Sequence, residues 1–226
     1  MRMIRATSVA NVDFFPQDAA MKVLAFTTQK GGSGKTALAS SIAVAAAADG
    51  RNIVCLDLDP QKSLFDWYER REANTPPVDT CDPAELDKAL VKLSKSKFDL
   101  VLLDLPGALD ARVSLIYRHI DYAVVPVKPT HADIAAAIPT ANHLKSVGKR
   151  FGFVLNQCFP GSPARSMDAA KALLKWSEVA PAMLSTRADY ADAYGTAQGV
   201  TEFNPKGKAA QEINLLWAWL SSKIGE

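Results

Sequence analysis

The segment KVLAFTTQKGGSGKT, residues 22–36, constrains the fold of this chain more than any other. Its first residues are apolar, β-branched or aromatic, which is typical of a strand. A glycine-rich turn follows, and the alanine-rich residues 37–48 indicate a helix that packs closely on a sheet. Because glycine has no Cβ, its backbone can adopt positive φ and its N–H groups can converge on phosphate oxygens. This order of strand, glycine turn, lysine, hydroxyl and helix predicts a loop that wraps a phosphate chain.

Two lysines flank the glycines, and this departs from the ordinary phosphate-binding loop. The common pattern, G-x-x-x-x-G-K-[ST], needs a glycine at position 29, where this chain has Gln29. Lys35 would place its charge on the β- and γ-phosphates, and the hydroxyl of Thr36 would reach Mg²⁺. Lys30 is not needed by the loop of its own chain. The expected nucleotide-binding residues of this segment are Gly31, Gly32, Ser33, Gly34, Lys35, Thr36 and Ala37.

Carboxylates follow two further apolar runs, each of which indicates a buried parallel strand. One run leads into Asp57 and Asp59, which the period of a strand places on the same side of the chain. The other leads into Asp104 and a Pro-Gly turn. Ligands of parallel α/β sheets bind at the carboxyl ends of the strands, so we expect these side chains beside the phosphate loop. Asp104 would there hold a water on Mg²⁺.

Segments with strand and helix character alternate along the chain from residue 21. Strands are expected at 122–127 and 151–156, and helices at 35–49, 62–73, 82–94, 111–120 and 131–147. In the late part we expect a helix at 166–179, a short strand at 181–186, a helix at 188–197, an extended link at 199–205 and a last helix at 206–224. The alternation predicts an α/β fold, a single doubly wound domain at 21–226 with a mainly parallel sheet and helices on both faces. Residues 1–20 would be an N-terminal extension, to which the sequence assigns no role.

Composition narrows the class of protein. Hydrophobic residues make up 48% and charged residues 22%, with a net charge of +2, which fits one globular domain and does not by itself indicate nucleic-acid binding. The three cysteines form no C-x-x-C pair, so we expect neither a disulfide framework nor a zinc site. A reducing cytoplasm is the expected location. No apolar run approaches the roughly 18 residues of a membrane span, so no membrane partner is expected.

The string Lys30-Gly31-Gly32-Ser33-Gly34-Lys35-Thr36 is a deviant P-loop and resembles that of the ParA/MinD family of ATPases. Two further motifs carry the resemblance: residues 57–61, DLDPQ, are similar to the family's D-x-D-P-Q motif, and Asp104 matches its Walker B carboxylate. The resemblance covers most of the chain, from Met21 onward. It implies the P-loop nucleotide-triphosphatase fold of the deviant type.

The resemblance also implies a role for each site residue. Lys30, Lys35 and Asp59 would form the catalytic set, in which Lys30 reaches across a homodimer to the partner's nucleotide and Asp59 orients the attacking water. Thr36, Asp57 and Asp104 would form the metal site. Asn156 falls where the family reads adenine, although an ordinary turn residue at a strand end is the alternative. GTP is disfavoured, because Gln157 and Cys158 follow Asn156 where GTPases have N-K-x-D.

The implied activity is ATP hydrolysis with Mg²⁺, weak and stimulated by a partner, in a protein that forms a homodimer when it holds ATP. A short ParA-like protein of this kind would partition plasmid or chromosomal DNA with a centromere-binding or adaptor protein. It would be cytoplasmic and would associate with the nucleoid in its ATP state. The alternative is a positioning or recruitment ATPase for a protein assembly or a conjugative DNA-transfer complex. A nucleotide-binding scaffold without turnover is a third hypothesis.

Non-specific DNA binding would use basic residues of the late half of the chain. Residues 141–226 carry ten Lys and Arg against seven Asp and Glu. The first candidates are Arg187, Lys206 and Lys208, with Lys149 and Arg150 behind them. Such contacts to phosphates weaken steeply with salt. Plain surface charges are an equally good interpretation of any one of these residues.

Overall fold

The chain alternates strands and helices, and the computed structural model describes it over residues 20–107 and 111–225. The strands are β1 (Lys22–Phe26), β2 (Ile53–Asp57), β3 (Val78–Thr80), β4 (Leu100–Asp104), β5 (Tyr122–Val127), β6 (Phe151–Leu155) and β7 (Glu178–Val179). The helices are α1 (Lys35–Ala48), α2 (Ser63–Glu69), α3 (Leu86–Ser94), α4 (Ala111–Tyr117), α5 (His131–Ser146), α6 (Pro163–Leu173), α7 (Ala188–Gly195), α8 (Val200–Phe203) and α9 (Lys208–Gly225), with a 3₁₀ turn, η1 (Pro83–Glu85), before α3. The predicted extension, residues 1–20, falls outside the described residues except for Ala20.

β1 lies in the middle of the sheet, between β4 and β5. The order of the described strands is β3-β2-β4-β1-β5-β6-β7, and all their pairings are parallel. Phe26 of β1 and Asp57 of β2 are both in register with Asp104 of β4. The carboxyl ends of these three strands therefore meet at one edge. The predicted α/β fold with its parallel sheet is confirmed.

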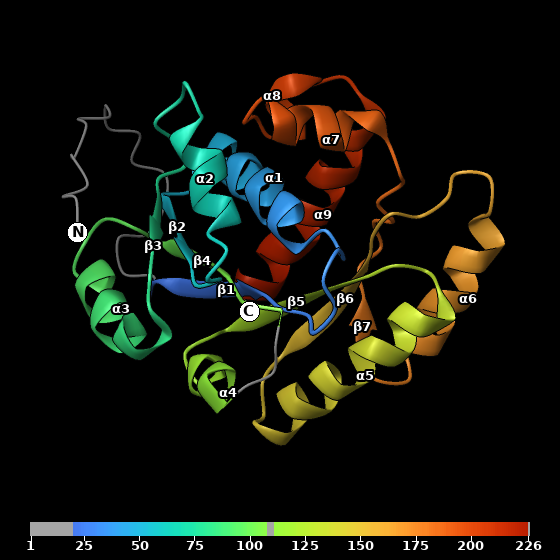
Figure 1. Ribbon diagram of the computed structural model, residues 1–226, viewed down its shortest axis with the longest axis horizontal. Helices are drawn as coiled ribbons and strands as arrows, with labels where there is room; N and C mark the ends of the chain where they lie inside the picture. The colour runs from blue at the N-terminus through green and yellow to red at the C-terminus, as the bar shows by residue number, and fades with distance from the viewer. Residues whose placement is uncertain (1–19, 108–110, 226) are drawn as a thin grey trace.

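Helices cover both faces of the sheet (Figure 1). Along β1, Leu24 and Phe26 pack on the face covered by α1, α2 and α7–α9, whereas Val23 and Ala25 pack on the face covered by α3–α6. These four side chains are at most 5% exposed. A strand that is buried on both faces is apolar throughout, which explains the continuous apolar runs of the sequence. No helix among the described residues is both long enough and apolar enough to span a membrane.

The edge of the sheet beyond β6 differs from the prediction. The helix expected at 166–179 gives way to β7, and the strand expected at 181–186 is not formed. Pro181 has no N–H group and cannot continue the pairing. The chain nevertheless follows β6 through single backbone bonds, such as that from the N–H of Leu184 to the carbonyl of Leu155 at 2.9 Å.

Two helices also differ from the prediction. The helix expected at 62–73 ends at Glu69, where the N–H groups of Arg70 and Arg71 donate to carbonyls three residues before them. The side chains of both arginines turn toward α7 and the segment after it. The link expected to be extended contains α8. The N–H of Gly199 donates to the carboxylate of Glu202 at 2.9 Å, so this short helix begins with a capping contact that the sequence analysis did not identify.

α9 approaches the sheet closely where β6 has a glycine. The ring of Trp219 meets that of Tyr122 edge to face, with 5.8 Å between centroids. A Cβ on Gly152 would lie 2.3 Å from the hydroxyl of Tyr122 and 2.5 Å from the ring of Trp219. The Tyr122 hydroxyl donates to Glu178 at 2.8 Å, so it is not free to move aside. The lack of a side chain at this position allows α9 to pack on the sheet.

We expect Gly152→Ala to lower the free energy of unfolding by about 2–4 kcal/mol, because the added methyl forces α9 away from the sheet. Gly161→Ala is the matched control, since its Cβ would meet no atom within 4 Å. We expect the control to change the free energy by less than about 0.5 kcal/mol. Urea unfolding followed by tryptophan fluorescence measures both variants, and equal effects would contradict the packing argument.

Candidate nucleotide-binding site

The loop between β1 and α1 has the conformation that its glycines predict. Gly32 and Gly34 have φ of 72° and 84°, the left-handed region that favours glycine. Gly34 is the N-cap of α1 and has no side chain to cap the helix, and the first turn contains no acidic residue. The first backbone N–H groups of α1 therefore remain available to an acceptor from outside the chain, as in phosphate-binding loops.

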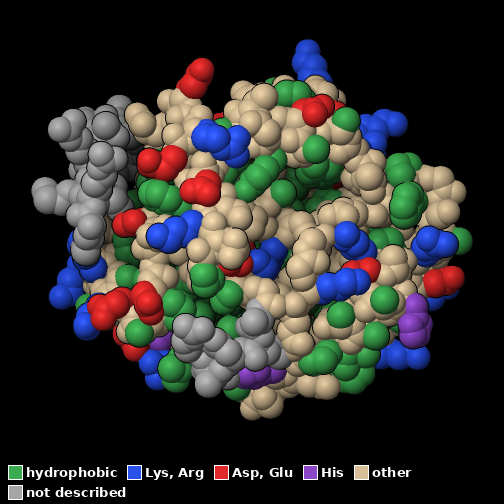
Figure 2. Space-filling model, viewed as in Figure 1, with side chains coloured by type: hydrophobic (Ala, Val, Ile, Leu, Met, Phe, Trp, Pro, Cys, Tyr) green, Lys and Arg blue, Asp and Glu red, His purple; other side chains and the backbone are tan. Residues whose placement is uncertain are grey.

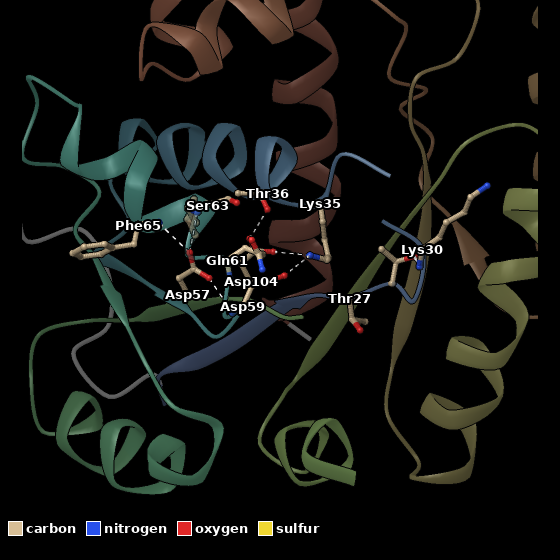
Figure 3. Close-up of polar contacts among 12 residues, drawn as sticks. Thr27, Lys30, Lys35, Thr36, Asp57, Asp59, Gln61, Ser63, Phe65 and Asp104 are labelled. Atoms are coloured by element: carbon tan, nitrogen blue, oxygen red, sulfur yellow. Dashed lines mark hydrogen bonds and ion pairs between the residues drawn. The ribbon is translucent and has the colours of Figure 1, made fainter. Parts of the chain in front are cut away.

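Three charged side chains from different segments meet at the carboxyl edge of the sheet (Figure 3). The ammonium of Lys35 lies 3.5 Å from Oδ1 of Asp104 and 3.8 Å from Oδ2 of Asp59. The hydroxyl of Thr36 donates to Oδ2 of Asp104 at 2.7 Å. Asp104 is fully buried, Lys35 is 10% exposed and Asp59 is 21% exposed. The structure thus brings together four of the predicted catalytic and metal-binding residues.

The Asp104 carboxylate fits a role beside a metal ion. Burial raises its pKa to about 6, against the opposing effects of Lys35 and Thr36. Its Oδ1 atom is buried and accepts no hydrogen bond from any described residue. A carboxylate and a hydroxyl are oxygen ligands that suit Mg²⁺. No cluster of three or more His, Cys, Asp or Glu in the described part of the chain could hold a metal alone, so phosphate and water oxygens would complete the set.

Asp57 is directed at the backbone rather than at Thr36. Its Oδ1 accepts the N–H of Asp59 at 3.0 Å, and its Oδ2 accepts the N–H groups of Leu64 and Phe65 at 2.9 and 3.0 Å. Asp57 is 2% exposed, and burial raises its pKa. The carboxylate therefore anchors the loop after β2 and the first turn of α2. Its predicted metal-binding role stays a prediction.

Lys30 lies away from the cluster around Lys35 (Figure 3). Its ammonium forms an ion pair with Oδ1 of Asp133 at 2.6 Å, and its side chain is 43% exposed whereas that of Asp133 is 8% exposed. Asp133 also accepts the hydroxyl proton of Thr130, the N-cap of α5. The two lysines of the loop thus face different partners.

The sequence analysis did not identify Asp133. The segment 130–133, THAD, does carry a signal, because a threonine followed three residues later by an acidic residue marks the start of a helix. That pattern predicts the cap of α5 and contains no information about Lys30. The ion pair requires the loop after β1 and the start of α5 to lie side by side, which the pairing of β1 with β5 brings about.

Asn156 contacts the phosphate loop. Its side-chain amide donates to the carbonyl of Ser33 at 2.7 Å, and its Oδ1 accepts the N–H of Gln157 at 2.9 Å. A Cβ on Gly34 would lie 2.5 Å from the Asn156 amide nitrogen, so the two segments are in close contact. Asn156 therefore reaches the predicted nucleotide site. Its recognition of adenine stays a prediction.

The basic residues predicted to bind DNA do not form one group. Arg187 donates to Glu212 of α9 at 3.0 and 2.7 Å, so its charge is already paired. Lys149 donates to two backbone carbonyls near the end of α4, at 2.7 and 3.0 Å. Lys206 and Lys208 are exposed and form no ion pair with a described residue. Figure 2 shows basic and acidic side chains interspersed over the face in view.

The parallel sheet, the glycine loop and the carboxylates at its edge define a nucleotide-binding α/β domain with a deviant P-loop. Residues 24–200 match a family model described as the CobQ/CobB/MinD/ParA nucleotide binding domain. The chain belongs to this family.

Individual relatives extend over nearly the whole chain. Maintenance of carboxysome distribution protein A from Halothiobacillus neapolitanus is 29% identical over 205 residues, which cover 84% of this chain and 92% of that protein. The MinC:MinD cell division protein complex of Aquifex aeolicus contains a chain with a TM-score of 0.74 and 20% identity, covering 89% of this chain and 96% of that one. An ATP complex of Cyanothece McdA has a TM-score of 0.71 and 16% identity, covering 92% of this chain and 98% of that one. At these identities the two structures show a shared fold.

We expect Asp57→Ala to lower the free energy of unfolding by about 2–3 kcal/mol in the absence of nucleotide, because three backbone N–H groups lose their acceptor. Asp59→Ala is the matched control. Its carboxylate is more exposed and accepts one backbone N–H, that of Gln61 at 3.0 Å. We expect the control to cost less than about 1 kcal/mol. Urea unfolding at pH 7.5 distinguishes them, and an equal loss in both would show that Asp57 is not the anchor.

Proposed function

We propose that this protein is an ATPase that dimerises in its ATP-bound state and uses cycles of dimerisation and hydrolysis to position a large cargo. The observation that carries the proposal is the division between its two loop lysines. Lys35 lies among the carboxylates of its own site, whereas Lys30 faces away from them toward Asp133. A lysine that serves the nucleotide of a second subunit has to face outward. Membership of a family that includes MinD and ParA supports the same conclusion.

Lys35 and Asp59 would act on the nucleotide of their own subunit. Phosphate oxygens would replace the two carboxylates near Lys35, because they carry more negative charge and the helix N-terminus favours them. Asp59 is then free to orient the attacking water, and its greater exposure than Asp104 suits that task. Mg²⁺ held through Thr36 and Asp104 would neutralise charge on the phosphates.

Lys30 would act on the nucleotide of the partner subunit. The ion pair with Asp133 joins a half-exposed ammonium to a buried carboxylate. In the monomer this ion pair holds the Lys30 side chain against its own subunit. The phosphates of a second, facing subunit offer more charge than one carboxylate and can compete for the lysine. Exchange of Asp133 for phosphate would thereby link ATP binding to dimerisation.

The sequence motifs and the similar proteins favour different cargos. The sequence analysis placed DNA partition first and the positioning of a protein assembly second. The similarity to a protein named for the maintenance of carboxysome distribution, over most of both chains, favours the second. We therefore propose a large protein assembly as the cargo, reached through an adaptor protein that stimulates hydrolysis. Partition of plasmid or chromosomal DNA uses the same ATP cycle and is the alternative.

We expect Lys30→Ala to bind ATP within about threefold of the wild-type affinity and to remain a monomer with ATP, because Lys30 serves the other subunit. Asp133→Asn is the matched variant, since it removes the intramolecular partner and keeps the lysine. We expect Asp133→Asn to dimerise with ATP. Analytical ultracentrifugation with a non-hydrolysable ATP analogue measures both, and an ATP-dependent Lys30→Ala dimer would contradict the proposal.

Mixing two inactive variants tests the action of Lys30 across the dimer. A mixed dimer of Lys30→Ala and Asp59→Ala has one complete site, which combines Asp59 of one subunit with Lys30 of the other. Each mixed dimer has one complete site of two, so equal amounts would restore part of wild-type hydrolysis. The restored part is about one quarter if the subunits pair at random, and it changes with the share of mixed dimers because Lys30→Ala does not pair with itself. No recovery in dimers that demonstrably form would place the action of Lys30 within its own subunit.

We expect the ATP-bound dimer to retain DNA on filters in a salt-sensitive way through Lys206 and Lys208. Replacing each lysine with alanine would reduce the slope of log affinity against log salt by about 0.9 per contact. Arg187→Ala is the control, because its charge is already paired with Glu212. An unchanged slope in the lysine variants, or a lowered slope in the control, would show that other residues bind DNA.

A further inference from the structure

The loop that carries Asp59 is joined directly to α2, so the position of this helix determines the position of the loop. Residues 60–62 are all that separates Asp59 from Ser63, the first residue of α2. Lys62 is held in the left-handed region with φ of 53°, and the N–H of Gln61 donates to Asp59 Oδ1 at 3.0 Å. Because this connection is short and internally hydrogen-bonded, a displacement of α2 would also displace Asp59.

α7 and the segment just after it hold α2 at both ends. At the start of α2, the hydroxyl of Tyr194 donates to the carbonyl of Ser63 at 2.8 Å. At its end, the guanidinium of Arg70 donates to the carbonyl of Gly195 at 2.8 Å and lies over the ring of Tyr194. Arg71 adds a hydrogen bond to the carbonyl of Ala197 at 2.8 Å. These contacts join segments that are 125 to 131 residues apart in the chain.

The segment that holds α2 is itself fixed to the phosphate-loop helix and to α9. A Cβ on Gly199 would lie 2.7 Å from the Cβ of Val44, so the chain before α8 lies directly against α1. Just before α7, the guanidinium of Arg187 donates to Glu212 of α9 at 3.0 and 2.7 Å. α1 begins at Lys35, so α7 and α8 connect the helix of the phosphate loop with the loop of Asp59.

The charge environment keeps the Tyr194 hydroxyl a donor. Burial raises the pKa of Tyr194, and the nearby charges of Asp104 and Asp57 raise it further against the effect of Arg70. The hydroxyl therefore stays protonated at neutral pH and continues to donate to the carbonyl of Ser63.

We propose that α7 positions Asp59 through α2, with Tyr194 and Arg70 as positioning residues for hydrolysis. The inference rests on the proposed ATPase function and goes beyond it, because neither residue belongs to a predicted site motif. It assigns the alignment of the attacking water to the contacts that α7 makes at the two ends of α2.

Tyr194→Phe tests this inference, with Tyr190→Phe as the matched control on the same helix. Both remove one hydroxyl, but that of Tyr190 contacts α9 and not α2. We expect Tyr194→Phe to lower kcat for ATP about threefold to tenfold with KM unchanged, because one hydrogen bond that positions the loop is lost. We expect the control to keep its kcat within about twofold. Arg70→Ala is expected to behave like Tyr194→Phe. A kcat for Tyr194→Phe that matches the control would overturn the inference.

Hydrogen exchange of the backbone separates this inference from the ATPase proposal. We expect the amides of residues 58–66 to exchange about threefold to tenfold faster in Tyr194→Phe than in the wild type, and not in Tyr190→Phe. This measurement needs no hydrolysis. A wild-type protein without ATPase activity would refute the proposed function, whereas equal exchange in the two variants would refute the positioning role of α7.

Discussion

The ion pair between Lys35 and Asp104 is the interaction on which the carboxyl edge of this sheet depends. Asp104 is fully buried, and a buried charge is costly unless it is paired and hydrogen-bonded. The pairing of β1 with β4 brings the two residues together, with Phe26 in register with Asp104. The turn from β1 to α1 must be tight enough to return Lys35 to that edge, and the positive φ of Gly32 and Gly34 makes it so. The ion pair therefore depends on both the register of the sheet and the conformation of the loop.

Three carboxylates of similar sequence context have different surroundings and suit different tasks. Asp57 is saturated by backbone N–H groups and anchors the loop and α2. Oδ1 of Asp104 has the Lys35 ammonium at 3.5 Å and accepts no hydrogen bond from a described residue, which suits a metal ion. Asp59 is the most exposed of the three, which suits contact with water. All three residues are aspartates, so the burial of each carboxylate and its hydrogen-bonding partners distinguish the tasks that it suits.

Charge distinguishes the two lysines of the loop, which fits the proposal that they serve two nucleotides. Lys35 is enclosed by carboxylates of its own subunit, while Lys30 rests on Asp133 with part of its side chain in solvent. In the proposed cycle both lysines exchange a carboxylate for phosphate, but only Lys30 has to cross to another subunit to do so. The proposed positioning by α7 bears on the same chemistry, because its contacts with α2 hold the segment that carries Asp59.

The sequence by itself determined the parallel sheet, the phosphate loop and the carboxylates at the strand ends. These features are encoded in contiguous residues, through the apolar runs of buried strands and the glycines that permit positive φ. It was less informative where pairing with distant segments decides the outcome. β7 ends before Pro181, and Arg187 forms an ion pair with Glu212, while its predicted contact with DNA stays a prediction. Only the tertiary structure decided that Asp133 receives Lys30, that Asp57 is directed at the backbone of α2, and that Tyr194 holds Ser63. The physical reason is that a side chain takes its partner from whatever the packed chain places within hydrogen-bonding distance, and sequence spacing does not specify those long-range neighbours.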